Sequence, residues 1–128
     1  MADIYIEGLD ALEKKLGRIN ALNVLGPPMV RSMARLHGYM ATYPPPPPAS
    51  RYRRTGLLGR SWQMRVENSG TQIVGVLGNP TPYGPFVQAA AMQAEVHRGR
   101  WRTDEMAIEK NGKAIIADFQ RSIAEALK

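Results

Sequence analysis

Five consecutive prolines, Pro44 to Pro48, limit what this chain can fold into more than any other feature. Proline has no backbone N–H, and its ring clashes with a preceding helical turn, so this stretch cannot lie inside a helix or a central strand. We expect polyproline II, which rises about 3.1 Å per residue and makes a stiff spacer of about 15 Å. Residues 42–56 are therefore predicted to form an extended arm on a single domain that spans residues 1–128.

The segment before the arm predicts one strand and helical structure. Residues 3–7 alternate polar and apolar side chains, which indicates a short strand. From Leu9 to about Ala41, apolar residues recur at intervals of three and four, which is typical of a helix with one buried face. Gly26 breaks this pattern, and the two prolines after it suit the first turn of a new helix. The sequence leaves open whether this segment is two helices or one kinked helix.

The segment after the arm predicts an antiparallel β-hairpin. Trp62, Met64 and Val66 alternate with polar residues, so they are expected on the inner face of a strand. The residues NSGT are predicted to form the turn, and the apolar run QIVGVLGN is predicted as the second strand.

A long helix is predicted at the C-terminus. Thr103 and the two acidic residues after it are typical of a helix start. Residues 88–102 are predicted as a loop or a strand, with the choice left open. Unlike elements in runs, without βαβ alternation, indicate an α+β fold with the C-terminal helix packed on the sheet. The stripe that predicts this helix is Ile115, Ile116, Phe119, Ile123 and Leu127.

The residue types found here do not predict catalysis, a metal site or a cofactor. The chain contains no cysteine, which excludes thiolate ligands and a cysteine nucleophile. His37 and His97 are far apart, and neither has a carboxylate at a metal-ligand spacing. Ser61 lies in GRSWQ, which is not a nucleophile elbow, and no glycine-rich phosphate loop is present. No apolar run is long enough to span a membrane and no secretory signal opens the chain, so we expect a cytoplasmic protein.

The net charge of +6 and the basic run after the prolines permit two binding hypotheses. Arginines interleaved with Tyr52 and Trp62 have the composition of a single-strand nucleic-acid surface. The proline run also contains PxxP, the pattern that SH3-type grooves bind. A small basic nucleic-acid-binding protein and a PxxP adaptor are therefore alternatives to a stiff arm used in assembly.

Three stretches, taken in order, resemble a known family. They are RTGLLGRSWQMRVE, VGVLGNPTPYGPFVQ and IEKNGKAIIADFQRSIAEAL. The chain is similar to the small tail-completion, or head–tail joining (neck), proteins of long-tailed bacteriophages, from about Arg54 to the end and more loosely over the opening strand and helix. In that family the second stretch continues into Glu-x-Gly-Thr. Here Gln88 replaces the acid, and the Gly-Thr is missing.

The resemblance implies a virion structural protein without catalytic activity. It implies an α+β fold and assembly into a ring, typically hexameric, at the head–tail junction. The implied partners are copies of itself, the connector or adaptor, and the tail-tube or tail-terminator proteins. DNA would pass through the ring without sequence-specific binding. The subunit would be made in the host cytoplasm and end in the virion, without contact with a membrane.

A ring subunit must contact two identical neighbours through two different surfaces. A stiff arm loses little entropy on docking, and arginine tolerates burial at interfaces, so we expect the arm to cross a subunit boundary with Tyr43 and Tyr52 as anchors. The residues predicted for the interface are Tyr43, Pro44, Pro45, Pro46, Pro47, Pro48, Arg51, Tyr52, Arg53, Arg54, Tyr83, Phe86, Arg98, Arg100 and Trp101.

Overall fold

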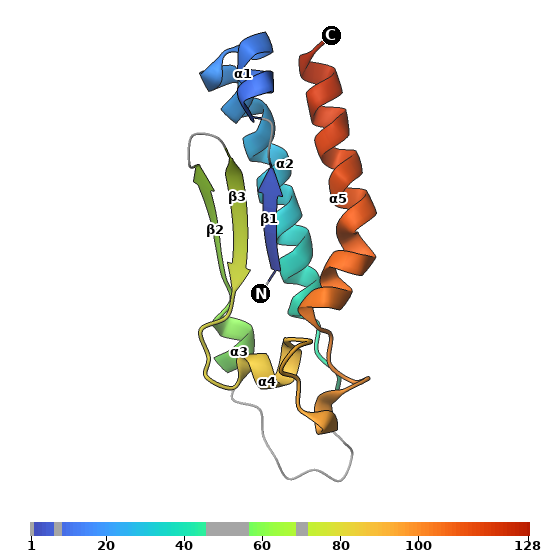
Figure 1. Ribbon diagram of the computed structural model, residues 1–128. Helices are drawn as coiled ribbons and strands as arrows, with labels where there is room; N and C mark the ends of the chain where they lie inside the picture. The colour runs from blue at the N-terminus through green and yellow to red at the C-terminus, as the bar shows by residue number, and fades with distance from the viewer. Residues whose placement is uncertain (1, 7–8, 46–56, 69–71) are drawn as a thin grey trace.

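The computed structural model describes residues 2–6, 9–45, 57–68 and 72–128 (Figure 1). Most of the predicted arm, residues 46–56, lies outside the described residues. Within them, no helix combines the length and the hydropathy that are needed to cross a membrane. The elements in chain order are β1 (Ala2–Ile6), α1 (Leu9–Leu16), α2 (Arg18–Met40), α3 (Leu57–Arg60), β2 (Gln63–Asn68), β3 (Ile73–Gly78), α4 (Gly84–Gln88), a 3-10 helix η1 (Glu95–His97) and α5 (Asp104–Ala126).

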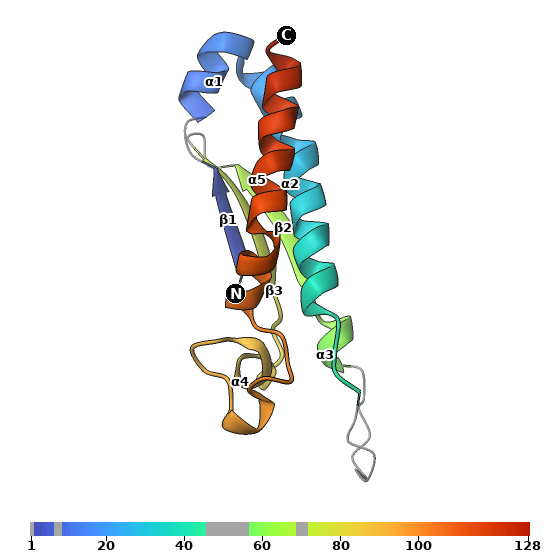
Figure 2. The same cartoon turned by 90° about the vertical axis from the view of Figure 1, so that its right-hand side faces the viewer.

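The fold has two layers, a three-stranded sheet and a pair of long helices on one of its faces (Figures 1 and 2). The strand order is β1-β3-β2, and β3 is antiparallel to both neighbours. Helix α2 packs against β3, while α5 lies mainly along α2 and meets the sheet at β1. The predicted α+β fold, with its N-terminal strand, its hairpin and its long C-terminal helix, is confirmed.

The strand register places apolar residues of all three strands on the helix side of the sheet. Met64 is opposite Leu77, and Val66 and Ile4 are both opposite Gly75. Residues that are directly opposite share a face, so these side chains all belong to the inner face. Leu77 is fully buried, but Met64 is 48% exposed and Val66 is 44% exposed. The helices therefore cover β3 and leave the inner face of β2 open, although this strand was expected to face the core.

Helix α2 corrects the predicted position of the helix break. The helix runs through Gly26, Pro27 and Pro28, and the break falls earlier, at Gly17, whose φ of 81° favours glycine. A proline inside a helix costs about 3 kcal/mol, whereas burying one large apolar side chain stabilises by about 1.5–3 kcal/mol. The buried stripe keeps its spacing of three and four across the prolines, and its combined burial outweighs their cost. The stripe consists of Ala21, Leu25, Met29, Met33, Leu36 and Met40.

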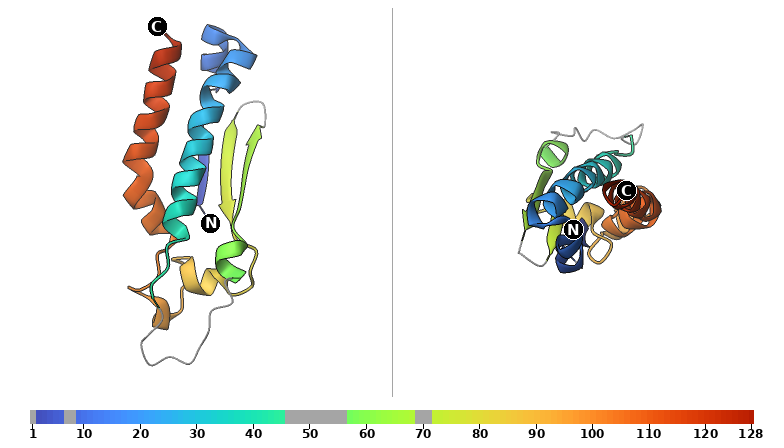
Figure 3. Two further views of the ribbon diagram at one scale, coloured as in Figure 1. Left: turned by 180° about the vertical axis from the view of Figure 1, so that it is seen from behind. Right: turned by 90° about the horizontal axis from the view of Figure 1, so that it is seen from above.

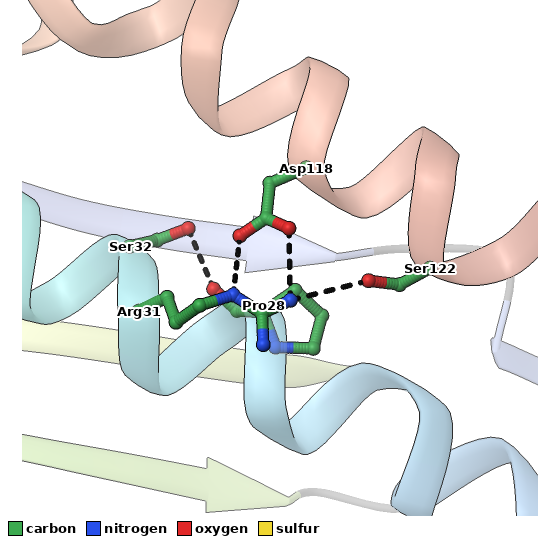
Figure 4. Close-up of polar contacts among 5 residues, drawn as sticks. All are labelled: Pro28, Arg31, Ser32, Asp118 and Ser122. Carbon is green, nitrogen blue, oxygen red and sulfur yellow. Dashed lines mark hydrogen bonds and ion pairs between the residues drawn. The ribbon is translucent and has the colours of Figure 1, made fainter.

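A forked ion pair fixes how α5 lies along α2 (Figure 4). The Nε and Nη2 atoms of Arg31 each donate to a different carboxylate oxygen of Asp118 at 2.8 Å, and Nη2 also donates to the Ser122 hydroxyl at 3.3 Å. These hydrogen bonds lower the pKa of Asp118 and raise that of Arg31. Because the pair is solvent-exposed, its main effect is geometric: two parallel bonds permit one register between the helices.

The helix starts and caps follow the sequence prediction at α5. The Thr103 hydroxyl accepts a hydrogen bond from the Met106 amide at 3.3 Å, and Asp104 and Glu105 occupy the first turn. The carboxylates oppose the positive end of the helix dipole. The predicted start of the C-terminal helix is confirmed.

Side chains of α2 pack closely on Gly75 of β3, and substitution of this glycine tests that contact. A Cβ at Gly75 would lie 2.6 Å from the Met29 sulfur and 3.0 Å from the Met33 sulfur. We expect Gly75→Val to lower the free energy of unfolding by about 1–3 kcal/mol through overpacking. Gly78→Val on the same strand is the control, because a Cβ there meets nothing within 4 Å. Urea unfolding of both variants checks this, and equal stability would contradict the packing described here.

Candidate functional site

Three aromatic side chains from distant parts of the chain meet at the end of the molecule where α2 stops. We call Tyr43, Trp62 and Trp101 the aromatic cluster. Trp62 Nε1 donates to the Tyr43 hydroxyl oxygen at 2.8 Å, and the rings of Tyr43 and Trp101 lie 5.1 Å apart between centroids. All three are half-buried. Tyr43 therefore anchors the start of the proline segment onto other parts of the same chain.

Both histidines pack against tryptophans of the aromatic cluster. His37 lies 6.4 Å from Trp62, and His97 meets Trp101 edge-on at 5.9 Å, as measured between ring centroids. The two histidines thus belong to different sides of the cluster. Their observed contacts are those of packing residues.

Residues 88–102 form an irregular loop with the short η1 helix, so the strand alternative is wrong. Side-chain amides hold this loop. Gln88 Nε2 donates to the Met40 carbonyl at 2.8 Å and to the Arg102 carbonyl at 3.1 Å. Gln93 Nε2 donates to the Val87 carbonyl at 2.7 Å. An ionised glutamate at position 88 could not donate the two hydrogen bonds that Gln88 makes.

The sequence-predicted interface residues fall into two groups within the described part of the chain. Tyr43 and Trp101 are brought together inside one subunit. Others point outward: Tyr83 is 41% exposed and Phe86 is 50% exposed at α4, and Arg98 is exposed on the loop. Arg100 and Pro45 are also exposed and Pro44 is half-buried, while Pro46, Pro47, Pro48, Arg51, Tyr52, Arg53 and Arg54 lie outside the described residues.

Two exposed apolar residues at the same end of the molecule were not predicted from the sequence. Met92 is 52% exposed and Val96 is 69% exposed, both on the loop that follows α4. With Tyr83 and Phe86 they make what we call the basal apolar surface. A loop has no periodicity that predicts which of its residues face outward. The apolar residues within AMQAEV were the only sequence feature that could have pointed to Met92 and Val96.

The environment of Tyr43 changes its acidity. Burial raises the pKa of Tyr43 above its ordinary value of 10.0, and the hydrogen bond from Trp62 opposes this effect. The phenolate form is therefore disfavoured in the folded protein. Stability from this site is complete below pH 10 and is lost as the pH rises through the folded-state pKa.

The described residues contain no cluster of side chains of the kind that holds a metal ion, since no three histidine, aspartate or glutamate side chains are suitably placed there. A scan of protein families, a search of curated proteins and a search of solved structures found no match to this chain.

Tyr43→Phe tests the aromatic cluster and its pH dependence. The change keeps the ring contact with Trp101 but removes the acceptor for Trp62 Nε1, so we expect a loss of about 0.5–1.5 kcal/mol in the free energy of unfolding at pH 7. Above pH 10 the gap to wild type should narrow, because the variant has no phenol to titrate. Denaturant unfolding from pH 7 to pH 11 measures this, and a constant gap would contradict the assigned environment.

Gln88→Glu tests how the loop is held. The carboxylate cannot donate to Met40 and Arg102, and Gln88 Oε1 is already buried without a partner among the described residues. Each carbonyl left unpaired costs about 1–3 kcal/mol, so a marked drop in thermal stability is expected at pH 7. Protonation restores one donor, so the deficit relative to wild type should shrink at acidic pH. A deficit that grows as the pH falls would contradict this role.

Proposed function

We propose that this chain is a structural subunit of a bacteriophage neck, which completes the tail and joins it to the head as a closed, hexameric ring. It would act through contacts with copies of itself and with the adjacent connector and tail proteins, without catalysis. DNA would pass through the ring, contacted through charge alone.

One observation carries this proposal: two of the family-like stretches, separate in sequence, are joined through one asparagine. Asn79 Nδ2 donates to the Leu58 carbonyl at 2.7 Å, and Asn79 Oδ1 accepts from the Thr81 amide at 3.2 Å and hydroxyl at 2.9 Å. Gly84 packs close to the same place, since a Cβ there would lie 2.8 Å from the Thr81 hydroxyl. Two of the stretches that carry the resemblance are therefore in direct contact in the fold, and this contact supports the proposal.

The basal apolar surface supports assembly as the mode of action. Single exposed apolar residues are common on proteins, but these four all belong to one short segment, residues 83–96, at one end of the molecule. Arg98 and Arg100 flank it on the same loop. A ring subunit needs such a surface for a neighbour or for the adjoining tail protein.

The nucleic-acid alternative receives less support from the geometry. Trp62 and Trp101 are both half-buried and engaged with Tyr43. A stacking platform for bases needs free aromatic faces. The positive charge remains available for non-specific contact with DNA in the ring.

Rings in solution and in particles test this proposal. We expect mass photometry of the purified chain to give one closed species several times the 14.2 kDa of the monomer. Cryo-electron microscopy of particles should place that ring at the head–tail junction. A protein that stays monomeric at every concentration and is absent from particles would contradict the proposal.

A further inference from the structure

The sheet and the helical layer are offset from one another. Strand β1 is an edge of the sheet, and α5 extends the helical layer beyond it (Figure 3). The space between them is an apolar groove of about 320 Å³. Ile116 is 58% exposed there, so α5 carries apolar surface that no strand of its own subunit covers. The groove is lined mainly by Ile4, Ile6, Ile115, Ile116, Phe119 and Ile123.

At the opposite edge of the sheet, it is a strand whose apolar face is left exposed. Strand β2 is the other edge, and its inner-face residues Met64 and Val66 are about half exposed because α2 packs mainly on β3 and covers β2 only in part. Neither β1 nor β2 contains a proline, so both edges keep backbone groups that are able to pair with another strand. At the β1 edge, α5 thus has an apolar surface that no strand covers. At the β2 edge, the strand has an inner face that the helices cover only in part.

We propose that β2 of a second copy of this chain pairs with β1, which places that copy's Met64 and Val66 in the groove under α5. This inference rests on the proposed ring, for which it supplies the contact between neighbouring subunits. The added strand covers the exposed face of Ile116, and α5 in turn covers the exposed inner face of the incoming β2. Strand addition gives backbone hydrogen bonds, and the alternating side chains give specificity.

The strand directions favour a ring over a dimer. Both β1 and β2 are antiparallel to β3, so they are parallel to each other. Rotation about an axis along the strands preserves direction, so β2 of one copy meets β1 of the next in parallel. Two different surfaces are joined at each contact, and such a contact closes into a ring when its rotation permits. Pairing β1 with β1 in a two-fold dimer would leave Met64 and Val66 uncovered.

Charge is complementary at one end of this contact. On α5, Glu109 precedes Ile116 by seven residues, and Ile116 precedes Ile123 by seven, so the three lie along one side of the helix. Arg60 comes shortly before β2, and both Arg60 and Glu109 are exposed. Parallel pairing brings the start of β2 to the start of β1, which lies beside the first turns of α5 (Figure 2). Arg60 of one copy therefore faces the acidic end of α5 in the next.

Two single substitutions and their mixture test the contact. Val66→Glu places a charge on the binding face of β2, and Ile116→Glu places a charge in the groove. Each substitution alone should therefore abolish rings. When the two variants are mixed, the unaltered β2 of the Ile116→Glu variant can still bind the unaltered groove of the Val66→Glu variant. We expect mass photometry to show heterodimers and nothing larger, which a two-fold contact cannot produce. Ala117→Glu, which changes an exposed residue next to Ile116 but about 100° around the helix, is the control and should assemble as wild type.

A charge exchange provides a test with variants whose fold is not in question. Arg60→Glu and Glu109→Arg should each weaken assembly at least tenfold at low salt, and the double variant should recover most of the loss. Unchanged rings in the Val66, Ile116 and charge variants would overturn this contact and leave the neck function standing on another surface. A wild-type protein that never assembles would overturn both.

Discussion

The packing of the α2 stripe against the sheet at Gly75 is the contact on which the rest of the structure depends. Met29 and Met33 can lie this close to the strand because Gly75 has no side chain. The contact centres α2 over β3, and the Arg31–Asp118 pair then sets α5 beside it. With the two helices placed this way, α5 extends past β1, and the inner face of β2 remains partly exposed to solvent. The offset of the two layers follows from this placement of the two helices.

In the proposed ring, each neighbouring copy would complete a subunit that has such an offset. The hydrophobic core of the chain is buried, including the α2 stripe and Leu77, but exposed apolar surface remains near both edges of the sheet. The two edges differ in kind, so they complement each other rather than themselves. At the far end, Tyr43 accepts a hydrogen bond from Trp62 and packs against Trp101, while the residues of the basal apolar surface are exposed. In the proposed ring, the sheet edges would join neighbours and the basal end would meet the arm or an adjoining protein.

Local patterns predicted the elements, and long-range contacts decided what the patterns could not. The hairpin was predictable because its alternation and its turn are adjacent in sequence. The break at Gly26 was wrong because a local glycine–proline signal was weighed above a stripe that stays in phase from Ala21 to Met40. The loop depends on Gln88 reaching Met40, 48 residues away, which spacing cannot reveal. Of the candidate site, composition pointed to Tyr43, Phe86 and Trp101, but which faces stay open depends on helix placement.

Covalent capture of the neighbouring subunit tests most directly whether the molecule works by binding copies of itself. The chain contains no cysteine, so a Val66→Cys, Ile116→Cys double variant has only those two thiols. Val66 lies on the edge strand β2, and Ile116 lies on α5 beside the opposite edge strand, β1. A short bis-maleimide should link them between subunits and give a ladder of multimers that ends at one closed species. Monomers alone after treatment, at concentrations where the untreated protein forms rings, would contradict the account.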